Sequence, residues 1–229
     1  MNNKLNHNNK LEKNETYDYN FLNRYFILGT FFLILQILVL YRNYFISEAI
    51  SIYFFCNHIL IILSIGFYLK NIKVINAIIC VGLIPQFMWL IDFFSSLLGF
   101  NLFGYSQYIF NQSLIMGLIT FLIHISTFVA LVFTLNEEKI HFKSLIYASS
   151  YVVLIYFLTI VFTPVENDIN CIYNACNISW LNFNYYTYLW IPLTILIIII
   201  PTFLLIRKLE KMILFEKIKN KLKMKRLKK

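Results

Sequence analysis

Charged side chains are scarce in this sequence, making up only 14% of its 229 residues, whereas hydrophobic residues make up 59%. Soluble domains carry about 25% charged residues. A chain so poor in charge cannot cover its surface against water, which excludes a soluble globular protein. The mean hydropathy of +0.68 agrees with this, and the composition predicts an all-α polytopic membrane helix bundle.

A small-residue cleavage site is also missing after the first apolar run, which begins at Tyr25. The sequence therefore predicts a retained first span rather than a cleaved signal peptide. Residues 1–24 are rich in Asn and Lys, and this composition predicts a disordered tail on the cytoplasmic side.

Six apolar stretches predict six transmembrane helices within a single domain, residues 25–206, because about 20 apolar residues cross the hydrocarbon of a bilayer. The predicted spans are 25–41, 50–69, 72–98, 112–135, 144–163 and 187–206. Residues 99–111 are aromatic and uncharged, and they predict a re-entrant or interfacial segment. Residues 207–229 form a basic tail.

Cations are almost absent from one side of this predicted topology. Six spans place both termini, the second turn and the fourth turn on the same side, and that side holds nineteen of the twenty Lys and Arg residues. The exception is Arg42 in the first turn. Because positive residues stay inside, both termini are predicted to be cytoplasmic and the protein to be multi-pass, in the cell membrane.

The net charge of +9 comes largely from the C-terminal tail, where residues 217–229 read KIKNKLKMKRLKK. This run directly follows a span, where anionic lipid headgroups attract each cation by about 1 kcal/mol. The sequence therefore predicts anionic lipid rather than nucleic acid as the partner of the tail.

The longest predicted outer loop contains Cys171 and Cys176, five residues apart. On an oxidising side these two cysteines could form a disulfide, and two free thiols are the alternative. The loop lacks a second Cys or His pair, so the spacing does not predict a metal site. No cofactor is predicted.

Polar and ionisable groups inside two of the spans mark the candidate site. The second span carries Cys56 and Asn57, and the fourth carries His124. Such residues are costly in hydrocarbon and are therefore candidates for function. The predicted directions of the spans place Cys56, Asp92 and His124 in the outer half of the membrane or at its midplane.

These residue types suit acyl chemistry. His124 could take the proton of Cys56 and make the sulfur a nucleophile, while Asp92 orients the imidazole. Asn57 or Gln86 could donate a hydrogen bond to the oxyanion of a tetrahedral intermediate. The alternative is that Cys56 only packs and that His124 only bonds a neighbouring helix. A metal site of Cys56, His58, Asp92 and His124 matches no known ligand spacing.

Four segments resemble the YwaF-like bacterial integral membrane proteins: CNHILIILSIGFYLKNIKVI, GLIPQFMWLID, FLIHISTFVALVF and HFKSLIYASSY. That family is related to the transmembrane cysteine acyltransferase that remodels ether phospholipids, and more distantly to the androgen-induced fatty-acid-ester hydrolases. The resemblance implies a nucleophile fourteen residues before a Lys-Asn turn, which Lys70 and Asn71 place at Cys56. It implies His124 as the general base and membrane lipids as acyl donor and acceptor.

The sequence thus predicts a lipid acyltransferase or lipid-ester hydrolase that works through an acyl-cysteine intermediate. Two alternatives remain open. A small-solute transporter would use Gln36, Pro85, Asp92 and His124 along a polar path, and a non-enzymatic membrane assembly protein would use the basic tail and the outer loop.

Overall fold

The computed structural model describes residues 2–45, 49–100, 102–135, 139–175 and 183–227, and side chains within 24–216 of these ranges except residues 49, 50 and 214. The described chain is helical and contains no strand. The α-helices are α1 (Asn2–Phe45), α2 (Phe55–Tyr68), α3 (Ile72–Leu97), α4 (Leu114–Thr134), α5 (Phe142–Phe162), α6 (Tyr186–Thr194) and α7 (Ile200–Leu227). The short helices η1 (Ala49–Tyr53), η2 (Gln107–Asn111), η3 (Val165–Asn167), η4 (Ile169–Cys171) and η6 (Ile195–Ile199) lie between them.

Five helical segments of the described chain are long and apolar enough to cross a membrane: Arg24–Phe45, Ile72–Leu97, Leu114–Thr134, Phe142–Phe162 and Tyr186–Ile213. Their outer faces carry large exposed apolar side chains, such as Ile34, Phe157 and Leu204. A water-soluble monomer rarely exposes so much apolar surface. The protein is therefore a multi-pass membrane protein, as its composition predicts.

The predicted second span, residues 50–69, is shorter in the structure. It divides into the 3-10 turn η1 and α2, and α2 has only 14 residues. At 1.5 Å per residue α2 extends about 21 Å, less than the roughly 30 Å of a hydrocarbon core. The other predicted spans agree with helices of the structure to within a few residues, except at the two ends of the chain.

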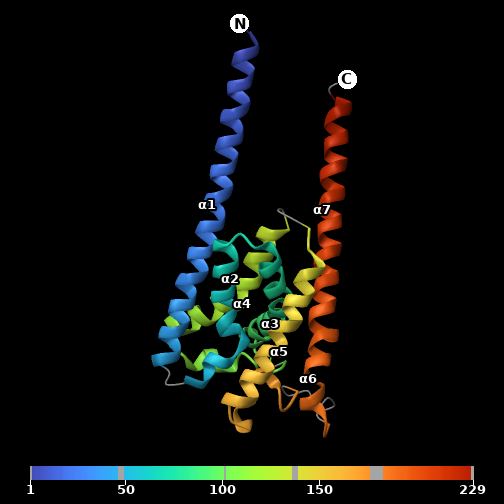
Figure 1. Cartoon of the computed structure of the whole chain (residues 1–229). Coiled ribbons are helices and arrows are strands. Elements are labelled where there is room, and N and C mark those ends of the chain that lie inside the picture. The colour runs from blue at the N-terminus through green and yellow to red at the C-terminus, as the bar shows by residue number, and fades with distance from the viewer. Residues whose placement is uncertain (1, 46–48, 101, 136–138, 176–182, 228–229) are drawn as a thin grey trace.

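At both ends the helices continue beyond the predicted spans. Helix α1 begins at Asn2, within the segment predicted to be a tail, and α7 runs to Leu227 through the basic tail. Figure 1 shows α1 and α7 projecting from the same end of the bundle. We call this the tail end, and the opposite end the loop end.

The last span is interrupted by a π-helical turn, η6, between Pro192 in α6 and Pro201 in α7. Proline lacks an N–H and cannot make the regular helix bond, so the ladder readjusts beside it. Helices α6 and α7 thus form one irregular rod.

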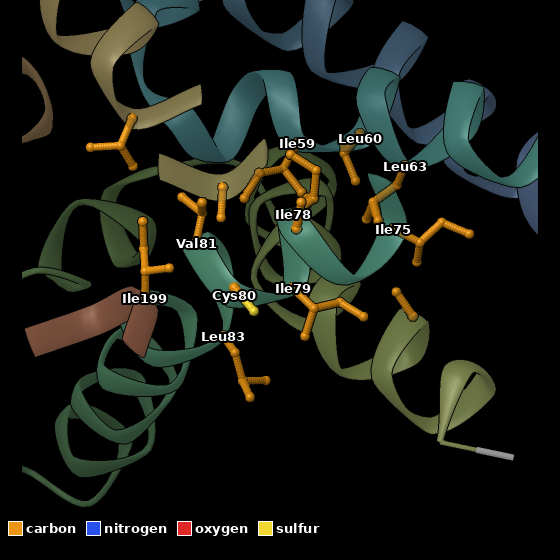
Figure 2. Close-up of a cluster of buried hydrophobic side chains, with 14 of the residues drawn as sticks. Ile59, Leu60, Leu63, Ile75, Ile78, Ile79, Cys80, Val81, Leu83 and Ile199 are labelled. Carbon is orange, nitrogen blue, oxygen red and sulfur yellow. The ribbon is translucent and has the colours of Figure 1, made fainter. Parts of the chain in front are cut away.

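Helix α3 lies at the centre of the bundle, in contact with α2, α4, α5 and α7. Of its most apolar stretch, 61% is buried, against 22% for α5. Figure 2 shows its side chains Ile75 and Ile78 beside Leu63 and Ile59 of α2. Cys80 is a fully buried free thiol and packs in the apolar core.

Gly82 of α3 packs tightly against Thr127 of α4 and Ile59 of α2. A Cβ atom on this residue would lie 2.6 Å from Thr127 Cγ2 and 2.7 Å from Ile59 Cδ1. Only glycine fits this contact, which sets the distance between the helices that carry Gln86 and His124.

Candidate functional site

Arg42, near the loop end of α1, forms the centre of the largest buried polar cluster of the described side chains. Its Nη2 donates hydrogen bonds to Asn57 Oδ1 at 3.1 Å and Asn43 Oδ1 at 2.9 Å. Its Nη1 donates to Thr120 Oγ1 at 2.9 Å, and its Nε donates to Asn43 Oδ1 at 3.2 Å. One guanidinium thereby joins α1, α2 and α4.

The sequence predicts that Arg42 lies in a turn, and its pattern indicates no role for this residue. The structure places it inside the helix, with only 8% of its surface exposed. A signal was present, because Arg42 is the single cation on the side of the predicted topology that holds no other. A cation on the outer side beside a span is an exception to the positive-inside rule. Such an exception marks Arg42 as a candidate functional residue, as polarity within a span marks His124 and Cys56.

Cys56 lies in the first turn of α2, partly exposed at the bundle surface, and its thiol is free. It is within electrostatic reach of Arg42 and of the Tyr151 hydroxyl on α5. That hydroxyl is hydrogen-bonded to His58 Nδ1 at 3.1 Å. Tyr151 thus joins α5 to α2 through His58, two residues after Cys56.

His124 is buried in α4, and its Nδ1 lies 2.8 Å from the carbonyl oxygen of Thr120. A carbonyl only accepts, so Nδ1 carries the proton and Nε2 keeps its lone pair. This is the tautomer that a general base needs. The Nε2 lone pair of His124 can therefore accept a proton.

A column of stacked aromatic rings holds the His124 imidazole in place. Its ring stacks on Trp89 with a centroid distance of 3.8 Å, and Trp89 stacks on Phe93 at 5.4 Å. Phe93 in turn stacks on Phe110 at 5.8 Å, and Phe110 is exposed. The column leads from the buried imidazole to the surface of the bundle.

No hydrogen bond joins Cys56 to His124 among the described residues. Both are within electrostatic reach of the Arg42 guanidinium. Arg42 bonds Asn57, the residue after Cys56, and Thr120, one helical turn before His124. Arg42 therefore links the turn of α2 that carries Cys56 to the turn of α4 that precedes His124.

Asn57 uses both ends of its amide in this cluster. Its Oδ1 accepts from Arg42, and its Nδ2 donates to the carbonyl oxygen of Ser51 in η1. One N–H of the Asn57 amide thus closes the turn before α2, and the role of Asn57 as an oxyanion donor stays a prediction.

Gln86 is likewise engaged, between α3 and α4. Its Nε2 donates to the Ile123 carbonyl oxygen at 3.0 Å, and its Oε1 accepts from the Thr127 backbone N–H at 3.1 Å. The Thr127 hydroxyl also donates to Oε1, at 2.6 Å. The Gln86 amide thus binds the α4 turn Ile123–Thr127, which contains His124. Gln86 is therefore a positioning residue instead of the predicted oxyanion donor.

Asp92 does not orient His124, contrary to the sequence-based prediction; the Thr120 carbonyl does so. The Asp92 carboxylate accepts hydrogen bonds from the backbone N–H groups of Phe103, Gly104 and Ser106 and from the Ser106 hydroxyl, at 2.7–3.1 Å. It folds the segment between α3 and α4, which was predicted to be re-entrant or interfacial. Burial, and then the charge of Asp92, raise the pKa of Tyr105 in this segment.

The start of α2 is held by Asn170, which has a positive φ of 59°. Its Oδ1 accepts from the Phe55 N–H at 2.8 Å, and its Nδ2 donates to the Tyr53 carbonyl oxygen at 2.8 Å. Asparagine tolerates this left-handed conformation better than most residues. Asn170 therefore fixes the backbone directly before Cys56 from a loop that lies 115 residues further along the chain.

Of the outer-loop cysteines, Cys171 is disulfide-bonded, and Cys176 lies outside the described residues. Within the described part of the chain, no group of three His, Cys, Asp or Glu side chains could hold a metal ion. Gln36, predicted for a solute path, uses its Oε1 to accept from the Ile61 N–H at 3.1 Å.

Comparisons of the chain with protein-family models, with curated proteins and with solved structures found no match. The resemblance to the YwaF-like proteins stays a prediction, and the function is argued from the site.

Proposed function

We propose that this protein is an integral membrane enzyme that transfers or hydrolyses lipid acyl groups, with Cys56 as nucleophile and His124 as general base. The observation that carries the proposal is the bridging position of Arg42. Its hydrogen bonds to Asn57 and Thr120 bring the first turn of α2 and the His124 region of α4 to one buried cluster.

In the first step His124 Nε2 takes the thiol proton, and the sulfur forms a bond to the ester carbonyl carbon. The carbon–oxygen bond of the ester then breaks, and the departing alkoxide takes the proton from the imidazolium. In the second step an acceptor alcohol or water gives its proton to Nε2 and its oxygen attacks the thioester carbon; the carbon–sulfur bond then breaks, and the departing Cys56 sulfur takes the proton back from the imidazolium. Transfer and hydrolysis differ only in this acceptor.

The free structure contains no hydrogen bond between the two residues, so substrate binding has to bring the sulfur and Nε2 together. Catalytic hydrogen bonds are often long before substrate is bound and tighten in the complex. The positive charge of Arg42 would favour the developing negative charge on sulfur in a low-dielectric site.

We also propose that α2 crosses the membrane as a sixth, short span, which puts both termini in the cytoplasm and the site in the outer half of the cell membrane. Support comes from α1 and α7, which project from the same end of the bundle in Figure 1. The basic C-terminal tail would then bind anionic headgroups of the inner leaflet.

The test is labelling by a lipid-like thioester or fluorophosphonate probe in membranes. We expect labelling of the native protein and of Cys80→Ala, loss of labelling in Cys56→Ala, and labelling at least tenfold slower in His124→Asn. Cys80 is the matched control because it is the other free thiol of the described chain. Labelling that persists in Cys56→Ala would contradict the proposal.

The transporter alternative has less support, since Gln36, Gln86 and Asp92 all use their polar atoms in bonds inside the bundle. Solute flux through reconstituted protein that is unchanged in Cys56→Ala would favour that alternative.

A further inference from the structure

Among the side chains that the structure describes, none in the cluster around Arg42 carries a negative charge. Its four hydrogen bonds all go to neutral oxygens, those of Asn43, Asn57 and Thr120. No carboxylate among the described side chains pairs with it, and Asp92 is occupied by the segment that it folds. A buried charge without a partner is strongly destabilising.

The cluster also lacks hydrogen-bond acceptors. A guanidinium has five N–H groups, and the four bonds of Arg42 leave one N–H of Nη1 unused. The buried Asn43 Nδ2 has no partner, and neither has the buried indole Nε1 of Trp89, whose ring stacks on His124. The unpaired donors of Arg42 and Asn43 therefore lie side by side, and Asn43 is only 7% exposed.

A ligand that provides both the missing negative charge and the missing acceptors must be an anion with several oxygen atoms. Phosphate has this chemistry, and arginine is the side chain best suited to bind it, because its N–H groups match the phosphate oxygens in pairs. Arg42 lies close to the end of α1 at Phe45, and the three residues between them correspond to about 4.5 Å along the helix axis. This depth corresponds to the boundary between hydrocarbon and headgroups at the loop end.

We propose that Arg42 and its unpaired neighbours bind the phosphate of a glycerophospholipid, which makes the substrate of the site a phospholipid. Identifying this lipid as the substrate rests on the proposed function, whereas phosphate binding itself requires no chemistry at Cys56. Arg42 is then a binding residue, which holds the headgroup while the ester carbonyls lie deeper, toward Cys56.

The test uses the full-length Cys56→Ala protein in dodecyl maltoside micelles, which cannot form an acyl-enzyme. Binding of dioleoyl phosphatidylglycerol is measured by native mass spectrometry and by the shift in Tm, and dioleoylglycerol, which lacks the phosphate, is the matched lipid. We expect phosphatidylglycerol to bind at least tenfold more tightly than dioleoylglycerol. Arg42→Gln should weaken the binding of phosphatidylglycerol at least tenfold. Arg42→Lys keeps the charge without the paired N–H groups and should give an intermediate loss.

The exposed Arg207 at the tail end is the matched control, and Arg207→Gln should leave binding unchanged. Equal binding of the two lipids to protein with native Arg42 would overturn the proposal, and this comparison does not depend on any Arg42 variant folding. Inorganic phosphate that competes at millimolar concentration would identify phosphate alone as sufficient, whereas competition by phospholipid only would make the acyl chains part of the ligand.

The two proposals fail separately. Phosphatidylglycerol binding to Cys56→Ala, together with probe labelling that does not require Cys56, would keep the phosphate site and remove the acyl chemistry. Cys56-dependent labelling without a preference for the phosphate-bearing lipid would do the reverse.

Discussion

Arg42 Nη2 donates a hydrogen bond of 3.1 Å to Asn57 Oδ1, and this bond joins the end of the first span to the residue beside Cys56. Arg42, which the sequence gives no expected role, thereby contacts the residue that follows the proposed nucleophile.

Asn57→Ala should lower stability by about 2 kcal/mol, because a buried group that loses its hydrogen-bond partner keeps its desolvation cost. The groups affected are the Arg42 cation, which loses an acceptor, and the Ser51 carbonyl, which loses a donor. The midpoint of thermal unfolding in detergent measures this effect. Asn174→Ala, in an exposed position, is the control and should change the midpoint little. An equal shift in both variants would show that the Arg42 cluster contributes nothing to stability.

Gln86→Leu should also destabilise the bundle, by about 2–3 kcal/mol, because buried polar groups lose their partners. These groups are the hydroxyl of Thr127 and the carbonyl of Ile123. The substitution should also slow the labelling of Cys56, because Gln86 binds the turn of α4 that carries His124. The comparison is Gln107→Leu at an exposed position, measured for both unfolding and labelling. Normal labelling in a folded Gln86→Leu protein would limit Gln86 to a role in stability.

Gly82→Ala should destabilise by about 1–3 kcal/mol, the usual cost of overpacking a core. The new methyl group would lie 2.6 Å from Thr127 and 2.7 Å from Ile59, and it overlaps with both. Combining it with Thr127→Ser removes Cγ2 and should restore part of the loss. Gly117→Ala is the control, with its nearest contact at an ordinary 3.4 Å. If the loss of stability in the double variant equals the sum of the losses in Gly82→Ala and Thr127→Ser, the new methyl group does not clash with Thr127.

Cys56 should react with a membrane-permeant maleimide at least tenfold faster than Cys80 in native membranes. Cys56 is partly exposed, whereas Cys80 is completely enclosed by apolar side chains. Mass spectrometry of partly modified protein gives the two rates. Comparable rates would mean that the region around Cys80 opens as readily as the start of α2.

The positions of the long spans could be predicted, because long apolar runs specify helices directly. Residues 72–98 were predicted as a span, and α3 occupies Ile72–Leu97. The short second helix could not be predicted as such, because its end is set from outside. Asn170 is distant in the sequence, and its bonds to Tyr53 and Phe55 decide where η1 ends and α2 begins.

The polar residues of the site could be found from the sequence, but their partners could not. Residue type marks Asp92, Gln86 and His124 as unusual in a span, yet their roles depend on which groups lie opposite. Asp92 faces backbone N–H groups of the next segment, and His124 finds its acceptor in its own helix at Thr120. Arg42 was missed because a cation near a predicted helix end looks solvated until the neighbouring helices are placed around it.

The shortness of α2 has a consequence for the lipid around it. If α2 crosses the membrane as proposed, its length of about 21 Å in a hydrocarbon core of about 30 Å is a hydrophobic mismatch, and lipids adapt to such a mismatch by locally thinning the leaflet. Cys56 sits at the end of this short rod, so the dip in the bilayer surface would bring glycerol esters down to the depth of its sulfur.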